Sequence, residues 1–280
     1  MPIENIPEIY IKDKKESPDL FVYDFKMTSD VVKSKVNLGM NMFSFLQIGK
    51  KQVHFAGTSV AVNKDQSLLL KKGNWLWTEL LDTDATYYCK LLFFSEKKLK
   101  DFLEKHTKNK EVKKDGMPYF IIRNDTYITS YLDSLSTISE APPVFMENLL
   151  AVKFEELMLY LLHKYGTNFE TYLQSLIAEE TSPLKKMIES KVHSNLKLEE
   201  IAFLCNMSLS TFKRHFINEY KVSPGKWLQD QRLHKAKETL EQGDLTPSDI
   251  YLDFGYNNLS NFSIAFKNKF GISPSEIPTT

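Results

Sequence analysis

The sequence predicts an α+β protein of two domains: a small β-barrel or sandwich with accompanying helices, then an all-α domain with two helix-turn-helix units. The length of 280 residues suits about two domains of ordinary size. Residues 37–95 consist of short apolar runs separated by polar turns, which is typical of many short strands. An aromatic motif near the C-terminus is repeated, which indicates two copies of one helical unit. We therefore place the domains at residues 1–180 and 181–280.

The composition favours a folded protein outside the membrane. Apolar residues make up 42% of the chain, with 19 Phe and 13 Tyr, so a sizeable core can form. No stretch approaches about 18 uncharged apolar residues, and the N-terminus lacks the basic start and apolar stretch of a secretion signal. Cys89 and Cys205 are too few and too far apart for a disulfide scaffold or a zinc site. We expect a soluble cytoplasmic protein.

The charge is balanced over the whole chain, with 36 Lys and Arg against 36 Asp and Glu. Residues 183–280 hold 13 basic and 11 acidic side chains, a net charge of +2. Such a weak surplus does not by itself indicate nucleic-acid binding, so the argument for DNA depends on the sequence pattern.

The repeat is the most informative pattern. Its first copy places aromatics at i, i+4 and i+8 and its second copy does the same 50 residues later, each followed by Ser-Pro: Phe212, Phe216, Tyr220 and Ser223-Pro224, then Phe262, Phe266, Phe270 and Ser273-Pro274. Such a stripe is one buried side of a helix. A shorter helix precedes each stripe and ends at Asn206 or Gly255, residue types that readily adopt the left-handed conformation. Each copy therefore predicts a helix-turn-helix, although paired helices of this kind also occur in proteins that bind no nucleic acid.

Residues 184–277 resemble the DNA-binding domain of the AraC/XylS family of bacterial transcription regulators. The resemblance is most specific over Ile250–Pro274 and nearly as good over Phe212–Pro224. It implies two helix-turn-helix units joined by one long helix, here about Pro224–Glu241, that bind double-stranded promoter DNA. It also implies a cupin-like barrel in the N-terminal part. Lys197 departs from the family, which commonly has a helix-capping Ser there, and Tyr251 replaces a usually small residue.

A helical wheel, drawn with the aromatic stripe facing inward, predicts the base-reading side chains. With the aromatic stripe of the first unit facing inward, Arg214 and Ser210 point outward and Lys213 lies on the flank, where the family places its base contacts. A solvated basic flank is the alternative. Around Leu259 and Ile264 in the second unit, the outward face carries no arginine, and its candidate contacts are Asn257, Asn258, Ser260, Asn261, Ser263 and Lys267.

The N-terminal barrel is predicted to be non-catalytic and free of cofactors. His54 is the single histidine between residues 37 and 95, whereas metal-dependent barrels of this kind need several. Six aromatics are candidates for lining a small-molecule pocket, and the alternative is that they simply fill the barrel: Phe43, Phe45, Phe55, Trp75, Trp77 and Tyr88.

Helices are expected after the barrel. A short charged helix over 97–105, a polar loop over 108–116 and a strand over 119–123 precede helices over 126–136, 145–164 and 168–179. The helix over 145–164 has a broad apolar face, which serves either for packing against the barrel or for a homodimer. Residues 179–182 are the expected linker.

Together these patterns predict a regulator in which a small molecule in the barrel alters the placement of the DNA-binding domain. In the alternative, the barrel is a docking module for regulatory proteins and binds no small molecule. An enzyme is not expected, because no nucleophile or metal constellation is present. Activation and repression both stay open.

Overall fold

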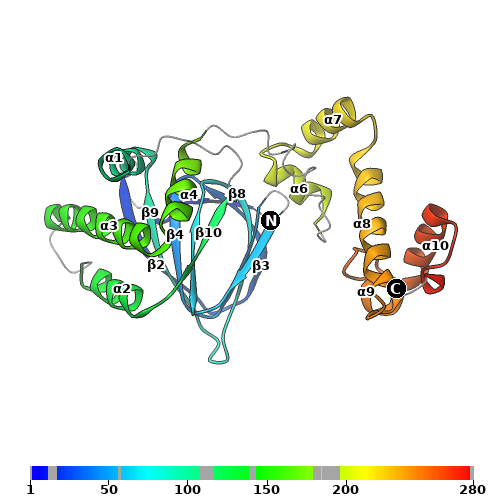
Figure 1. Ribbon diagram of the computed structural model, residues 1–280, viewed down its shortest axis with the longest axis horizontal. Helices are drawn as coiled ribbons and strands as arrows, with labels where there is room; N and C mark the ends of the chain where they lie inside the picture. Colours follow the sequence, from blue (N-terminus) through cyan, green and yellow to red (C-terminus); the bar gives the residue numbers. More distant parts are fainter. Residues whose placement is uncertain are drawn as a thin grey trace. The chain divides into compact units, whose positions relative to one another are not determined.

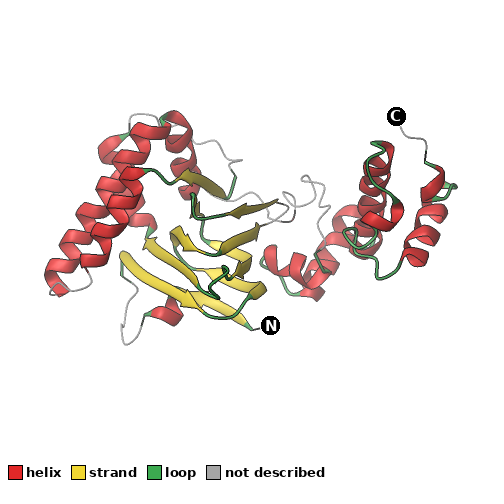
Figure 2. Ribbon diagram, turned by 90° about the horizontal axis from the view of Figure 1, so that it is seen from below, coloured by secondary structure: helices red, strands yellow, loops and turns green. Residues whose placement is uncertain are grey.

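The computed structural model describes residues 2–11, 18–55, 58–107, 117–138, 143–178, 184 and 196–277. The chain divides into two compact units between Thr181 and Ser182. The expected loop over 108–116 and the expected linker over 179–182 lie outside the described residues. Figure 1 shows the elements of each unit, and Figure 2 separates strands from helices by colour.

The first unit contains two five-stranded sheets. One has the order β1-β3-β8-β5-β6 and the other β10-β7-β4-β9-β2, with β1 parallel to β3 and antiparallel pairing between the other strands whose register is defined. The strands are β1 (Ile3–Ile6), β2 (Leu20–Met27), β3 (Val31–Leu38), β4 (Asn41–Ile48), β5 (Lys50–Phe55), β6 (Thr58–Val62), β7 (Gln66–Leu70), β8 (Gly73–Leu80), β9 (Tyr87–Phe94) and β10 (Tyr119–Arg123). A short 3-10 turn, η1 (Glu8–Tyr10), follows β1.

This arrangement confirms the predicted α+β fold, but the strands form two sheets and not a closed barrel, and they extend further than predicted. The strands begin at Ile3, whereas the sequence pattern indicated strands only from residue 37. In β3 the buried side chains are Ser34, Val36 and Leu38, and lysines alternate with them. The polar Ser34 at an inward position and the shift of register between Val31 and Ser34 break the period of two that identifies a half-buried strand.

Four helices pack against the second sheet: α1 (Glu96–His106), α2 (Thr126–Ile138), α3 (Pro143–Tyr165) and α4 (Thr167–Ile177). Figure 1 shows α1, α2 and α3 together on one side of the strands. Phe43 and Phe45 of β4 join Phe94 of β9 in one core with residues of all four helices, including Phe154 and Leu157 of α3. Consecutive residues of β4 are therefore buried on both faces of its sheet, which explains its uninterrupted apolar run.

A buried ion pair links two strands of the first sheet. Lys51 of β5 lies opposite Glu79 of β8, and its Nζ is 2.8 Å from Glu79 Oε1. Tyr87 donates its hydroxyl to the same carboxylate oxygen at 2.8 Å, and the Lys51 ammonium lies 3.9 Å from the ring centre of Trp77. Lys51 is only 1% exposed and Glu79 only 4%. Charges removed from water this completely need such partners.

The second unit consists of helices α6 (Leu198–Leu204), α7 (Leu209–Tyr220), α8 (Pro224–Glu241), α9 (Pro247–Ile250) and α10 (Leu259–Phe270), followed by the 3-10 turn η2 (Pro274–Glu276). α8 packs against both α7 and α10. Its 18 residues correspond to a length of about 27 Å at 1.5 Å per residue. Leu233, Ala236 and Leu240 of α8 form one core with Phe262 and Phe266 of α10.

We predict that the ion pair stabilises the first unit only as a pair. Glu79→Leu leaves the Lys51 cation buried without its carboxylate, so the free energy of unfolding should fall by about 3–5 kcal/mol. The double variant Lys51→Met/Glu79→Leu should recover most of that loss, and urea unfolding of the full chain measures both. A double variant as unstable as Glu79→Leu alone would contradict this account.

Candidate DNA interface

The first helix-turn-helix unit is built by local signals that the sequence displays. Asn206 has φ 57° in the turn after α6, and Ser208 caps α7 by accepting a hydrogen bond from the Thr211 backbone N–H at 3.2 Å. Lys197 cannot accept such a bond at the start of α6. There the Glu200 carboxylate accepts from the Lys197 backbone N–H at 2.7 Å, which satisfies an N–H at the start of the helix despite the missing Ser.

The second helix-turn-helix, around α9 and α10, has the same plan with a shorter first helix. α9 has four residues, and Asp249 accepts hydrogen bonds from the backbone N–H and hydroxyl of Thr246 at its start. Turns continue to Gly255, which has φ 79°. Tyr251 is half-buried and packs against the core of this unit, so a large residue is accommodated at this position.

The aromatic stripes face inward in both recognition helices. Phe212 is 1% exposed, and Phe216, Phe262 and Phe266 are fully buried. The Phe216 ring lies 4.9 Å from that of Tyr220 and 5.5 Å from that of Trp227 on α8. The inward orientation of these rings determines which side chains α7 and α10 can present outward.

On α7, all three predicted contact residues are exposed: Ser210, Lys213 and Arg214. The Ser210 hydroxyl lies 3.0 Å from that of Ser208 at the N-terminus of the helix. Asn218, which the sequence analysis did not select, is also exposed one turn after Arg214. Its position at i+4 from Arg214 was the signal that could have identified it.

On and before α10, the outward face is largely uncharged. Asn257, Ser260, Asn261 and Lys267 are exposed and Ser263 is half-buried. Asn258 is exposed too, but its Oδ1 accepts the Asn261 backbone N–H at 2.8 Å, so this side chain caps the helix. Ile264 is 61% exposed and Leu259 36%. These two exposed apolar side chains on a recognition helix suit contact with thymine methyl groups.

The six aromatics proposed for a ligand pocket lie in different surroundings. Phe43 and Phe45 face the helices. Phe55 packs on Trp75 with ring centres 4.6 Å apart, and Trp77 lies under the Lys51 ammonium. Tyr88 is half-buried and donates its hydroxyl to Asp24 at 2.7 Å. The first five are at most 9% exposed, so they fill the core.

Two kinds of chemistry, metal binding and cysteine reactivity, can be judged from the described residues. These residues contain no group of three His, Cys, Asp or Glu side chains that could hold a metal ion. Burial raises the pKa of the Cys205 thiol to about 12, and burial also raises the pKa of Cys89. Both thiols therefore stay protonated near neutral pH, which makes them poor nucleophiles. No helix in the described part of the chain is long and apolar enough to cross a membrane.

Two family models match this chain. Residues 41–172 match an ExsA N-terminal regulatory domain, and residues 201–278 match a helix-turn-helix domain. The chain belongs to the AraC/XylS family. It is 29% identical over 164 residues to the thermoregulatory protein LcrF of Yersinia pestis, covering 58% of this chain and 60% of LcrF. It is 30% identical over 139 residues to the HTH-type transcriptional regulator ExsA of Pseudomonas aeruginosa, covering 49% of each chain.

The matched region spans about half to 60% of the length of these two relatives. Among solved structures, an apo ToxT variant from Vibrio cholerae is similar over 94% of this chain and 98% of its own, with 14% identity and a TM-score of 0.45.

We predict that Phe262→Ala destabilises the second unit by about 3 kcal/mol or more, because it removes a fully buried ring from a small helical core. Thermal or urea unfolding measures the loss. Ile264→Ala on the same helix is the matched control, since its side chain is exposed and its removal should change stability by roughly 0.5 kcal/mol or less. Equal losses in the two variants would show that the buried face is assigned wrongly.

The two recognition helices should contribute unequally to sequence preference. A bidentate arginine–guanine contact is worth about 1–3 kcal/mol of discrimination, and we expect an apolar contact with a thymine methyl group to be worth less. Arg214→Ala should therefore relax the preference in one half of the binding site, and Ile264→Ala should change the other half only slightly. Titration of both folded variants with the same operator and with scrambled DNA measures this difference. A larger loss of specificity in Ile264→Ala would contradict the prediction.

Proposed function

We propose that this protein is a sequence-specific DNA-binding transcription regulator whose activity is controlled through its first unit. One observation carries the proposal: α7 and α10 are two recognition helices of the same construction in one compact unit, and both pack on α8. The length of α8, about 27 Å, suits recognition helices that enter successive major grooves about 34 Å apart on one side of B-DNA.

Base contacts are assigned to the exposed side chains of the two helices. Lys213 and Arg214 supply charged donors for guanine on α7, and Asn218 extends this face by one turn. In the second helix-turn-helix, the apolar centre at Ile264 is surrounded by polar side chains: Asn257, Ser260, Asn261 and Lys267. Lys267 and the polar side chains suit phosphate contacts, which position a protein on DNA without reading its sequence.

The proposed regulator of the protein is a small-molecule effector that binds the first unit. The match to a regulatory domain over residues 41–172 supports a regulatory role for this unit. Docking of a regulatory protein is the second candidate, and the filled core around Phe43, Phe45 and Trp75 favours it over a ligand among those aromatics. Yersinia enterocolitica VirF, 28% identical over 174 residues, is called a transcriptional activator, which supports activation here.

A homodimer through α3 is also part of the proposal. The apolar face of α3 packs against the first unit's own core, but three apolar residues on the opposite side of the helix remain exposed at intervals of seven: Phe145, Val152 and Leu159. Their exposed fractions are 58%, 61% and 41%. A spacing of seven residues places them along one side of the helix, where a second copy of α3 could pack. The protein is proposed to act in the cytoplasm and to catalyse no reaction.

We predict that residues 183–280 alone bind promoter DNA, because both recognition helices and α8 lie within that fragment. The affinity should fall steeply as salt rises, since phosphate contacts release counterions. Fluorescence anisotropy with labelled duplex DNA at several salt concentrations tests this, and circular dichroism shows whether the fragment is folded. A folded fragment without DNA binding at low salt would overturn the proposed function.

A further inference from the structure

A cleft separates the two helix-turn-helix elements on one side of α8. Its volume is about 450 Å³. Leu196 and Leu198 line it from the first helix-turn-helix, Phe254 and Tyr256 from the second, and Arg232 from α8. Figure 1 shows α8 running from α7 to α9 and α10. Because side chains do not fill this space, apolar packing across the cleft cannot fix how one helix-turn-helix is turned relative to the other.

Arg232 ties α8 to the start of the first helix-turn-helix. Its Nη2 donates a hydrogen bond to the backbone carbonyl oxygen of Leu196 at 2.8 Å. Burial lowers the pKa of Arg232, but a guanidinium stays protonated at neutral pH, so this hydrogen bond is charge-assisted. Leu196 is only 4% exposed, which holds its carbonyl group in place. The chain that enters α6 is therefore fixed to the middle of α8.

The first helix-turn-helix also contacts α8 on another side of that helix. The Phe216 ring of α7 lies 5.5 Å from the ring of Trp227 on α8. Trp227 and Arg232 are five residues apart, which corresponds to about 7.5 Å along α8 and about 140° around it. One contact by itself acts as a pivot, whereas two contacts on different sides of α8 oppose rotation about either of them.

The opposite wall of the cleft belongs to the second helix-turn-helix. Tyr256 packs against the core that α8 shares with α10, and its ring lies 5.3 Å from that of Phe262 on α10. Lys269 of α10 forms an ion pair with Asp230 of α8 at 2.8 Å. The second helix-turn-helix is thus anchored to α8 close to Arg232. A rotation of α6 and α7 about α8 therefore changes the direction of α7 relative to α10.

We propose that Arg232 is a positioning residue that fixes the rotation of the first helix-turn-helix about α8, and thereby the spacing between DNA half-sites that this protein accepts. In this role Arg232 reads no base. The inference deepens the proposed function and rests on it, since half-site spacing concerns only a protein that binds DNA through both α7 and α10. The rotation itself is a property of the free protein and can be measured without DNA.

The test with DNA uses the full chain and an operator selected with it from random duplexes. Insertion of one base pair between the half-sites moves one of them by about 3.4 Å along the duplex and turns it by about 35°. The unaltered chain should bind the inserted operator at least about tenfold more weakly than the selected one. Arg232→Met should bind the selected operator about tenfold more weakly, because the free protein is less preorganised, and should distinguish the two operators by less than about threefold.

Two further variants identify what Arg232 contributes. Lys235→Met removes one positive charge from the same helix, where Lys235 pairs with Glu238 at 2.9 Å, and it should keep the spacing preference. Arg232→Gln has a side chain two bonds too short to reach the Leu196 carbonyl, and it should behave like Arg232→Met. If Arg232 instead contacts a phosphate, its loss lowers the affinity and its salt dependence but leaves the spacing preference unchanged, which would overturn the proposal.

Spin labels measure the rotation without DNA. Glu219→Cys on α7 and Asn268→Cys on α10 place labels at exposed positions, whereas Cys89 and Cys205 are buried and should react slowly. Double electron–electron resonance gives the distribution of distances between the two labels. Adding Arg232→Met should broaden this distribution, and adding Lys235→Met should not. Equal widths with and without Arg232→Met would overturn the proposal.

The two measurements distinguish the role of Arg232 from the proposed function. A selected operator bound with an unchanged spacing preference in Arg232→Met would overturn the role of Arg232 and leave the proposed function intact. Broader distances in Arg232→Met, together with an unaltered chain that binds no DNA, would support the fixed rotation and overturn the proposed function. Failure of both Arg232 variants to fold, judged by circular dichroism, would assign Arg232 to the stability of the fold and overturn the positioning role.

Discussion

The burial of aromatic rings along one side of α7 and of α10 is the constraint on which the DNA interface depends. Phe212 and Phe216 in one helix, and Phe262 and Phe266 in the other, have at most 1% of their surface exposed. Since a helix turns by about 100° per residue, placing one side inward fixes the outward side. Arg214 and Ile264 are exposed for this reason, and the chemistry of the two outward faces differs although their construction is the same.

In the proposed function, the two faces contribute differently to recognition. We propose that the charged donors on α7 identify guanine and that the apolar centre on α10 adds methyl contacts. Phosphate contacts add affinity without sequence information. Recognition by two helices depends on α7 and α10 being held at a fixed separation. The packing of α8 against both helices provides it.

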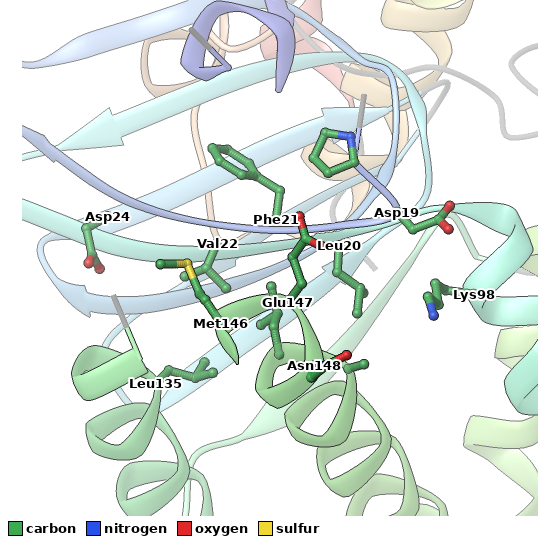
Figure 3. Close-up of a pocket in the computed structure, with 13 residues that line it drawn as sticks. Asp19, Leu20, Phe21, Val22, Asp24, Lys98, Leu135, Met146, Glu147 and Asn148 are labelled. Atoms are coloured by element: carbon green, nitrogen blue, oxygen red, sulfur yellow. The ribbon is translucent and has the colours of Figure 1, made fainter. Parts of the chain in front are cut away.

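The first unit is built differently, because its central strands are covered on both sides. β4 contributes Phe43 and Phe45 to the helix-covered core. On the first sheet, Lys51 and Glu79 are buried as a pair with Tyr87 and Trp77 around them. A groove lies at the edge of the second sheet, where β2 and the N-terminal half of α3 meet (Figure 3).

The sequence by itself determined the second unit almost completely. The stripe of Phe212 and Phe216 and the turn at Asn206 are local features, so a helical wheel and the rules of helix termini locate them. It also located α1, β10 and α3 to within one or two residues at each end, because each has a clear period or clear boundaries.

Only the tertiary structure decided what the first unit's side chains do. Strand pairing joins residues far apart in the chain, and a strand buried on both faces has no alternation to show which face is which. The sequence could not reveal that Phe43 faces the helices or that Lys51 meets Glu79. Nor could it bring together Leu20, Lys98 and Glu147, which line one groove only because β2, α1 and α3 pack side by side.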